Sequence, residues 1–239
     1  MKGATTVDEY TLAHGDLEIG PKFCAGILTA TANGQDILIK DASNRKHNSM
    51  RDCIPNGTDV KREYATYLFA KMVPGLVEVP AMALRNVNGT DALAMEIVQD
   101  AYHPWGWEIP QGISITIKRN MALFDAVVGN TDRHCQNFFV TSDRPKRVIA
   151  IDHGLCFPLP SQSGGRIDLG TTLFLRGERL PKWCINWLNK ILAMEFKIRR
   201  VLSAHIEYEA IEEMFKRVNW MLDRGRFMDA YDLRSYSRP

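Results

Sequence analysis

Three polar residues flank two apolar runs in the segment FDAVVGNTDRHCQNFFVTSDRPKRVIAIDHGLCFP, residues 124–158. Asp132 and Asn137 precede the first run, and Asp152 follows the second. Carboxylate and amide oxygens are the donors that a hard cation such as Mg²⁺ prefers, and a carboxylate without a metal can accept a proton. These residue types therefore predict a divalent-cation site with an acid or base beside it.

The two apolar runs predict an antiparallel hairpin because the turn-forming SDRPK separates them. A turn centred between Arg144 and Pro145 places Asn137 opposite Asp152, with their Cβ atoms roughly 5 Å apart. Strand alternation then places four apolar side chains on the opposite, buried face: Phe138, Val140, Ile149 and Ile151. Asp132 lies in a loop after a helix, so we expect it to reach the same point. A polar turn beside an ordinary hairpin is the alternative explanation.

Two further charged residues lie on elements that the sequence predicts before this hairpin. The run CAGILTATANGQDILIKDA indicates two strands joined at Asn33-Gly34, with Lys40 near the end of the second strand. The run DVKREYATYLFAKM indicates a helix that ends before Pro74-Gly75 and places Glu63 away from its apolar stripe. That stripe is formed by Val60, Tyr64, Leu68 and Met72.

The remaining pattern predicts a β-rich first part and a helical second part. Two strands are expected around Asn88-Gly89, and AYHPWGWEIPQG is typical of a connector. A helix is expected from about Ser114 to Val128 with Gly129 at its C-cap, and two or three helices follow residue 183. We therefore predict an α+β fold with a β-rich lobe over residues 1–99 and a mainly helical lobe over residues 100–239.

The motifs NTDRHCQN and AIDHG resemble the catalytic loop and metal-binding motif of the atypical kinases. This group holds the phosphatidylinositol 3- and 4-kinases, especially the type II 4-kinases, and the HipA-type bacterial kinases. Protein kinases follow the same order, with an Asp, four residues, an Asn, and then Asp-Phe-Gly after a hairpin. The resemblance extends from about Gly20 to Pro158 and implies a bilobal, protein-kinase-like fold.

The resemblance also implies roles for individual residues in an ATP-dependent phosphotransferase. Lys40 would bind the α- and β-phosphates and pair with Glu63, and Asn137 and Asp152 would hold Mg²⁺, with Mn²⁺ as an alternative ion. Asp132 would orient the acceptor hydroxyl and accept its proton. Backbone groups of four consecutive residues would bind adenine: Met95, Glu96, Ile97 and Val98.

Three departures from the protein-kinase pattern are visible. The chain has no G-x-G-x-x-G loop, and only GPKFCAG, residues 20–26, precedes Lys40. His153 stands where protein kinases have Phe, and Thr131 stands where they have Arg. A pseudokinase that acts through protein contacts is therefore an alternative. A metal-dependent hydrolase is another, with Asp132, His134, Asp152 and His153 as ligands, but it leaves Lys40 and Glu63 without a role.

Composition narrows the class of protein and its partners. Of the 239 residues, 45% are hydrophobic and 24% are charged, values typical of a globular protein. The net charge of +2 and the lack of a Lys/Arg run do not favour nucleic acid. Five scattered cysteines indicate a reducing compartment, and neither a signal peptide nor a membrane span is expected, so we predict a cytoplasmic protein.

The acceptor is left open by the sequence. The absence of a recognisable lipid-targeting region favours a protein hydroxyl, including one of the chain itself. A phosphoinositide is the alternative, because a basic and aromatic set after the hairpin provides residues of the kind that face membranes. That set is Arg166, Arg176, Arg179, Lys182, Trp183 and Trp187. The same residues are also compatible with a solvated segment followed by a core helix.

Overall fold

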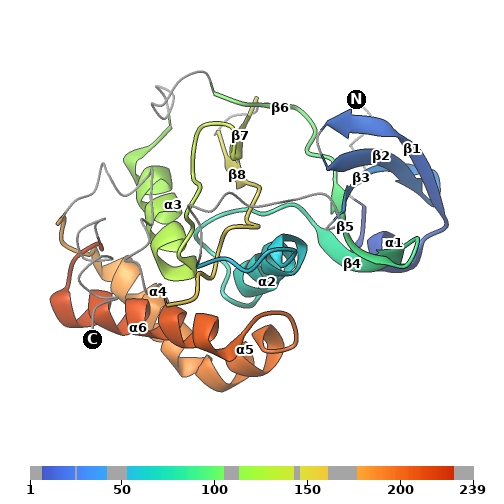
Figure 1. Cartoon of the computed structure of the whole chain (residues 1–239). Coiled ribbons are helices and arrows are strands. Elements are labelled where there is room, and N and C mark those ends of the chain that lie inside the picture. Colours follow the sequence, from blue (N-terminus) through green and yellow to red (C-terminus); the bar gives the residue numbers. More distant parts are fainter. Residues whose placement is uncertain are drawn as a thin grey trace.

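The computed structural model describes residues 7–24, 26–41, 53–104, 113–142, 146–160 and 177–228, and the statements below refer to these ranges. The chain forms two lobes (Figure 1), which confirms the predicted α+β class. The boundary predicted after Gln99 stays a prediction. No helix in the described ranges has the length and apolar character needed to cross a membrane.

The N-lobe is built on a five-stranded antiparallel sheet of order β1-β2-β3-β5-β4. Its strands are β1 (Leu17–Cys24), β2 (Ile27–Ala32), β3 (Gln35–Asp41), β4 (Met82–Val87) and β5 (Thr90–Glu96). Helix α1 (Glu9–His14), which the sequence did not predict, packs on β4 and β5, and α2 (Asp59–Met72) lies between this sheet and the helices of the C-lobe (Figure 1).

The C-lobe combines a small antiparallel sheet with four helices. The sheet has the order β6-β7-β8, formed by β6 (Ala101–Tyr102), β7 (Phe138–Thr141) and β8 (Val148–Ala150). The helices are α3 (Ile115–Val128), α4 (Lys182–Ala193), α5 (Glu195–Leu202) and α6 (Tyr208–Arg224). The small sheet lies on the N-lobe side of α3, where it presents the segments around β7 and β8 to the junction of the lobes (Figure 1).

The predicted β2–β3 hairpin is confirmed. Ala32 pairs with Gln35, and the two residues between them, Asn33 and Gly34, have φ values of 50° and 74°. Two consecutive left-handed residues make the turn that matches the twist of a hairpin, and Asn-Gly is the pair that adopts it most readily. The hairpin places Lys40 one residue before the end of β3.

Helix α2 matches its predicted bounds, but it is buried on two faces. The expected apolar stripe packs on the N-lobe sheet, where Val60, Tyr64 and Leu68 meet residues of β4 and β5. Ala65 and Phe69, on another face, belong to the large hydrophobic core of the C-lobe. The sequence predicted only the stripe that faces the sheet. The face of α2 toward the C-lobe was missed because it combines small, aromatic and charged residues, which form no simple apolar pattern.

The predicted pairing of β7 with β8 is wrong by one residue. Phe138 pairs with Ala150 and Val140 pairs with Val148, so Asn137 lies opposite Ile151 rather than Asp152. A shift of one residue exchanges the faces of a strand. The cluster around Phe138 and Val140 accordingly contains Val148 and Ala150 in place of the two isoleucines that we expected. The assumed turn centre, residues 143–145, lies outside the described residues.

Helix α3 begins and ends as the sequence predicts. The Ser114 hydroxyl caps its start by accepting a hydrogen bond from the backbone N–H of Ile117 at 3.2 Å. Gly129 ends it in the left-handed region at φ 65°, and its N–H donates to the Asp125 carbonyl. The chain enters the Asn130–Asn137 loop directly from this cap, so the cap geometry sets the direction of the loop.

Gly129→Ala should destabilise the protein more than Gly225→Ala, the matched change at the C-cap of α6. Both glycines have φ near +60°, where a Cβ costs about 1–2 kcal/mol. A Cβ on Gly225 meets no atom within 4 Å, whereas one on Gly129 lies 2.7 Å from Pro158 and 2.9 Å from the buried Arg217. Urea unfolding measures both changes in unfolding free energy, and equal losses would contradict the proposed packing at Gly129.

Candidate active site

A buried lysine joins the two lobes at the centre of the molecule. The Nζ of Lys40 on β3 donates to Glu63 of α2 and to Oδ1 of Asp152, the latter at 2.7 Å. Lys40 and Glu63 are 2% and 1% exposed, whereas Asp152 is 39% exposed. A buried ammonium needs paired carboxylates to offset its desolvation. The structure thus brings together three of the residues that the sequence singled out.

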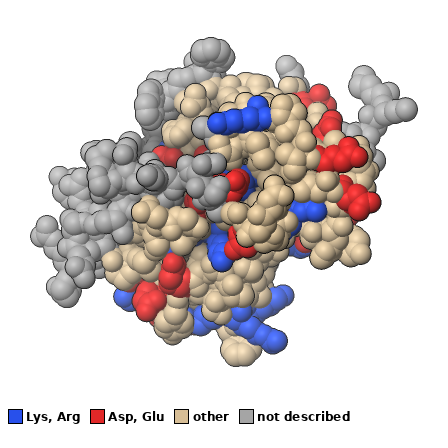
Figure 2. All heavy atoms as spheres, turned by 45° about the vertical axis from the view of Figure 1, so that its right-hand side comes forward, with Lys and Arg blue, Asp and Glu red and all other residues tan. Residues whose placement is uncertain are grey.

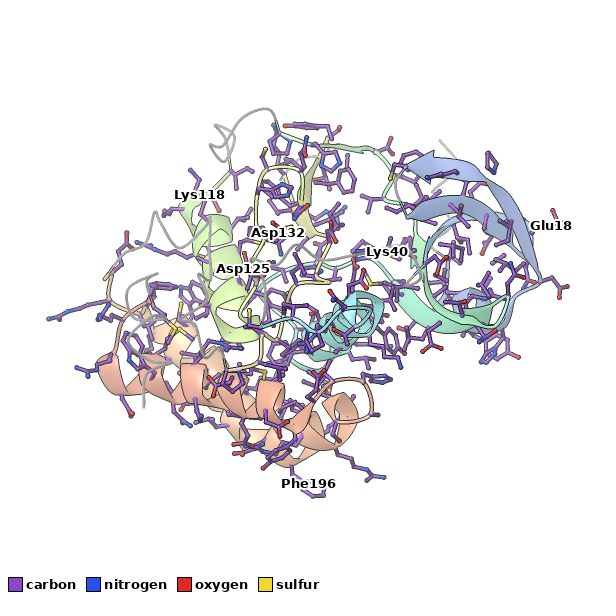
Figure 3. The ribbon with its side chains drawn as sticks, viewed as in Figure 1. Glu18, Lys40, Lys118, Asp125, Asp132 and Phe196 are labelled. Atoms are coloured by element: carbon purple, nitrogen blue, oxygen red, sulfur yellow. The ribbon has the colours of Figure 1, made fainter. Side chains whose placement is uncertain are left out.

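The loop after α3 brings Asp132 back to Asn137. The side-chain amide Nδ2 of Asn137 donates to the Asp132 carbonyl at 2.7 Å. This bond directs the opposite end of the amide, Oδ1, away from Asp132, and no described residue donates to that oxygen. The Asp132 carboxylate stays partly exposed, with Nε2 of His134 at 3.9 Å. Figure 3 shows Asp132 in the C-lobe and Lys40 at the N-lobe border, on two sides of one central region.

Asp152 reaches Lys40 through a bend rather than through strand pairing. The strand β8 ends at Ala150, and Asp152 adopts a left-handed conformation with φ 55°. Left-handed backbone is uncommon for a residue other than glycine, and Asp and Asn tolerate it best. The bend turns the chain out of the sheet, so the position of the carboxylate does not follow from strand alternation.

Arg133 connects the loop to the strands around it. Its guanidinium binds both oxygens of Asp125 on α3, with Nε and Nη2 each at 3.0 Å from one oxygen. Its Nη1 donates to the carbonyl of Asn137 and, at 3.0 Å, to that of Ile151. Burial opposes the charge on Arg133, but the adjacent Asp125 carboxylate outweighs it and raises the pKa of Arg133. Arg133 therefore fixes the backbone at Asn137 and directly before Asp152.

Asp125 was missed by the sequence reasoning, and Arg133 was noted without a role. The available signal was the acidic residue in the otherwise apolar run MALFDAVV of a core helix. A charge at such a position is found almost only with a partner. Figure 3 shows Asp125 on α3 beside the loop that carries Asp132. The partner could not be identified from the sequence because the pairing depends on how the loop folds back over α3.

His153 is fully buried and faces the interior. Its Nε2 lies 3.0 Å from Nη2 of Arg133, and no described residue bonds to its Nδ1. Burial and then the Arg133 guanidinium lower the pKa of His153 well below its usual value, so the ring is neutral at pH 7. A ring nitrogen that contacts a guanidinium is not placed to bind a cation. This geometry argues against the hydrolase alternative, which needs His153 as a ligand.

The segment between the lobes borders a pocket of about 690 Å³. Its lining includes Glu96, Ile97 and Val98 of the expected adenine-binding segment, but Met95 instead packs toward α2. Lys40 is not among the described residues that line this pocket. Adenine binding by the backbone of residues 95–98 stays a prediction.

Comparisons with known proteins agree with the predicted resemblance. Residues 119–173 match the family model of phosphatidylinositol 3- and 4-kinases, a range that contains Asp132, Asn137 and Asp152. The crystal structure of the Helicobacter pylori proinflammatory kinase CtkA is similar to this chain with a TM-score of 0.51 and 12% sequence identity. The similarity covers 97% of this chain and 98% of that one. No curated protein matches the chain.

These findings confirm the resemblance to atypical kinases of the phosphatidylinositol 3- and 4-kinase type and the kinase-like fold. The matched family segment begins in α3 and includes the Arg133 network, β7 and β8. At 12% identity, the likeness to the solved structure shows the fold alone. The chemistry must therefore be argued from the site itself.

His153→Phe should reduce the loss of stability on acidification. The pKa of His153 is lowered in the folded protein, so the unfolded chain takes up the proton first, below its ordinary pKa of about 6.5. Between pH 7.5 and 5.5 this uptake lowers the free energy of unfolding by an amount on the order of 1 kcal/mol. Urea unfolding at both pH values measures it. His205, whose pKa burial also lowers, should supply a remaining slope, and an unchanged slope in the variant would contradict the burial of a neutral His153.

Proposed function

We propose that the protein is an ATP- and divalent-cation-dependent phosphotransferase. The observation that carries the proposal is the contact of Lys40 with both Glu63 and Asp152. The three residues come from β3, from α2 and from the segment after β8. Phosphoryl transfer requires positioned positive charge against the phosphates, and a lysine amine held between two carboxylates supports such a role. The hydrolase alternative gives the Lys40–Glu63 pair no purpose.

The donor set fits a magnesium ion that is bound partly through substrate phosphates. We propose that Asn137 Oδ1 and the Asp152 carboxylate hold the ion, with Mn²⁺ as an alternative. No group of three or more His, Cys, Asp or Glu suited to a metal occurs in the described ranges. Mg²⁺ sites in kinases use one or two protein oxygens together with phosphates and water, so two donors suffice. When bound, the ion would neutralise charge that develops on the phosphates.

Asp132 is proposed to orient the acceptor hydroxyl and accept its proton. The carboxylate is partly exposed, while its backbone carbonyl is held by Asn137. Because Arg133, the next residue, is fixed by Asp125, the loop presents Asp132 from a rigid base. A general base must first lie within hydrogen-bond reach of the proton that it accepts, and its pKa matters second.

For the acceptor we propose a protein hydroxyl, with a phosphoinositide as the alternative. Among the described residues, the two tryptophans of the basic and aromatic set pack against the C-lobe core instead of forming the exposed surface that a lipid acceptor would favour. Trp187 is buried in the C-lobe core and donates to the Val73 carbonyl at 3.2 Å, and Trp183 packs against the same core. Arg166 and Arg176 lie outside the described residues. Figure 2 shows basic and acidic side chains interspersed on one face, which does not favour nucleic acid.

Substitutions at Lys40, Asp132 and Asp152 should separate nucleotide binding from transfer. Lys40→Met and Asp152→Ala should weaken ATP binding and transfer, whereas Asp132→Asn should keep ATP binding but lower kcat by about 100-fold or more. Lys61→Met, which removes a partly exposed lysine of α2, is the matched control. Calorimetric titration of ATP with Mg²⁺ and a phosphate-transfer assay measure the two steps. Robust phosphate release from simple esters by Lys40→Met would refute the phosphotransferase proposal.

The acceptor should be identified by following labelled phosphate from ATP. Wild-type protein and Asp152→Ala are incubated with ATP and Mg²⁺ together with mixed proteins or phosphoinositide vesicles. We expect label on protein, including the chain itself, only with the wild type. Label found only on the lipid would show that the acceptor is the phosphoinositide and not a protein. No label with folded protein that binds ATP would favour the pseudokinase alternative.

A further inference from the structure

A buried arginine next to Glu63 ties α2 to the C-lobe. Arg62 has no exposed surface, although it carries a full charge. Its Nη1 donates to the carbonyls of Cys156, at 3.2 Å, and of Phe157. Its Nη2 pairs with the carboxylate of Glu207 at the start of α6. Arg62 therefore links the helix that carries Glu63 to the segment directly after the Asp-His-Gly triplet.

Other contacts join the same segment to α2. A Cβ added to Gly154 would lie 3.0 Å from the Cβ of Asp59 in the first turn of α2, so the backbone here approaches the helix closely. The ring of Phe157 meets the ring of Phe69 edge to face, with centroids 6.4 Å apart. Together with Ala65, these aromatic residues lie in the core that α3, α4 and α6 share. On this side α2 packs as a C-lobe helix, and Figure 1 shows it between the sheet and those helices.

Glu207 uses its carboxylate for α2 rather than for its own helix. It occupies the N-cap of α6 with extended backbone, yet its side chain makes no capping hydrogen bond. Acceptors at this position normally bind the free N–H groups of the first turn. The carboxylate instead reaches Arg62 and balances a charge that would be costly to bury alone. The Glu207 carboxylate thus serves a contact with the neighbour of Glu63.

We infer that Arg62 and Glu207 are positioning residues that hold α2 against the C-lobe so that Glu63 meets Lys40. The C-lobe then holds the carboxylates of Glu63 and Asp152 in place. The N-lobe sheet contributes Lys40, which pairs with both. This inference rests on the proposed function and deepens it. The packing of α2 on the C-lobe thereby brings the three charged groups together.

The inference is tested by the accessibility of the Lys40 amine. Glu207→Ala and Arg62→Met are compared with wild type and with Glu212→Ala, which removes another acid of α6 that pairs with Arg199 rather than with α2. Acylation by an N-hydroxysuccinimide ester is followed by mass spectrometry, and the rate at Lys40 is divided by the rate at the exposed Lys197 in the same sample. Labelling of a buried amine reports local opening.

We expect the Lys40 ratio to rise about tenfold in Glu207→Ala and Arg62→Met, which corresponds to about 1.4 kcal/mol of lost positioning. Glu212→Ala should match wild type, and Glu207→Gln, which keeps an acceptor for Arg62, should lie between wild type and Glu207→Ala. In a transfer assay, the two positioning variants should raise KM for ATP more than they lower kcat, because Lys40 binds phosphates while Asp132 is untouched.

An unchanged Lys40 ratio in folded Glu207→Ala would overturn the inference, and so would an equal rise in Glu212→Ala, since that indicates general loosening. Glu207 is partly exposed, so we expect Glu207→Ala to fold. This variant therefore tests the inference even if Arg62→Met does not fold. The labelling needs no catalysis. A rise in the Lys40 ratio together with absent phosphate transfer by the wild type would therefore sustain the inference and refute the proposed function.

Discussion

The cost of burying the Lys40 ammonium constrains the arrangement of this molecule. Lys40 is 2% exposed, so its charge must be met by carboxylates at contact distance. One comes from Glu63 on α2 and the other from Asp152, which follows β8. No one element holds all three groups. The sheet, the helix and the loop must therefore keep fixed positions relative to one another, and the packing of α2 between the lobes provides that.

Two buried arginines provide the backbone support for this cluster. Arg133 holds the loop and β8 through the carbonyls of Asn137 and Ile151, and Asp125 balances its charge. Arg62 does the equivalent for α2 and the segment after Asp152. In each case a planar guanidinium joins main-chain carbonyls to one carboxylate, which a lysine cannot do with the same geometry. The two arginine side chains thus hold in place the backbone around Lys40, Glu63 and Asp152.

Much of the local structure was predictable because it depends on neighbours in the sequence. The Asn33-Gly34 turn, the bounds of α2 and the caps of α3 follow from backbone preferences and from periodicity over a few residues. Helix α1 and strand β1 were missed, and so was the two-residue strand β6, which lies in the segment expected to be a connector. Strand β1 is largely exposed and has register irregularities, so it lacks the regular alternation that identifies a strand.

The sequence by itself determined the order and type of the main elements and the candidate set of Lys40, Glu63, Asp132, Asn137 and Asp152. The elements followed from turn chemistry and helical spacing, which are local properties. The candidate residues followed from the resemblance of their motifs, and of the order of those motifs, to the atypical kinases. Only the tertiary structure decided the one-residue register of β7 and β8, the bend at Asp152 and the partners of the buried arginines. These depend on packing and charge balance between segments far apart in the chain, which no local pattern encodes.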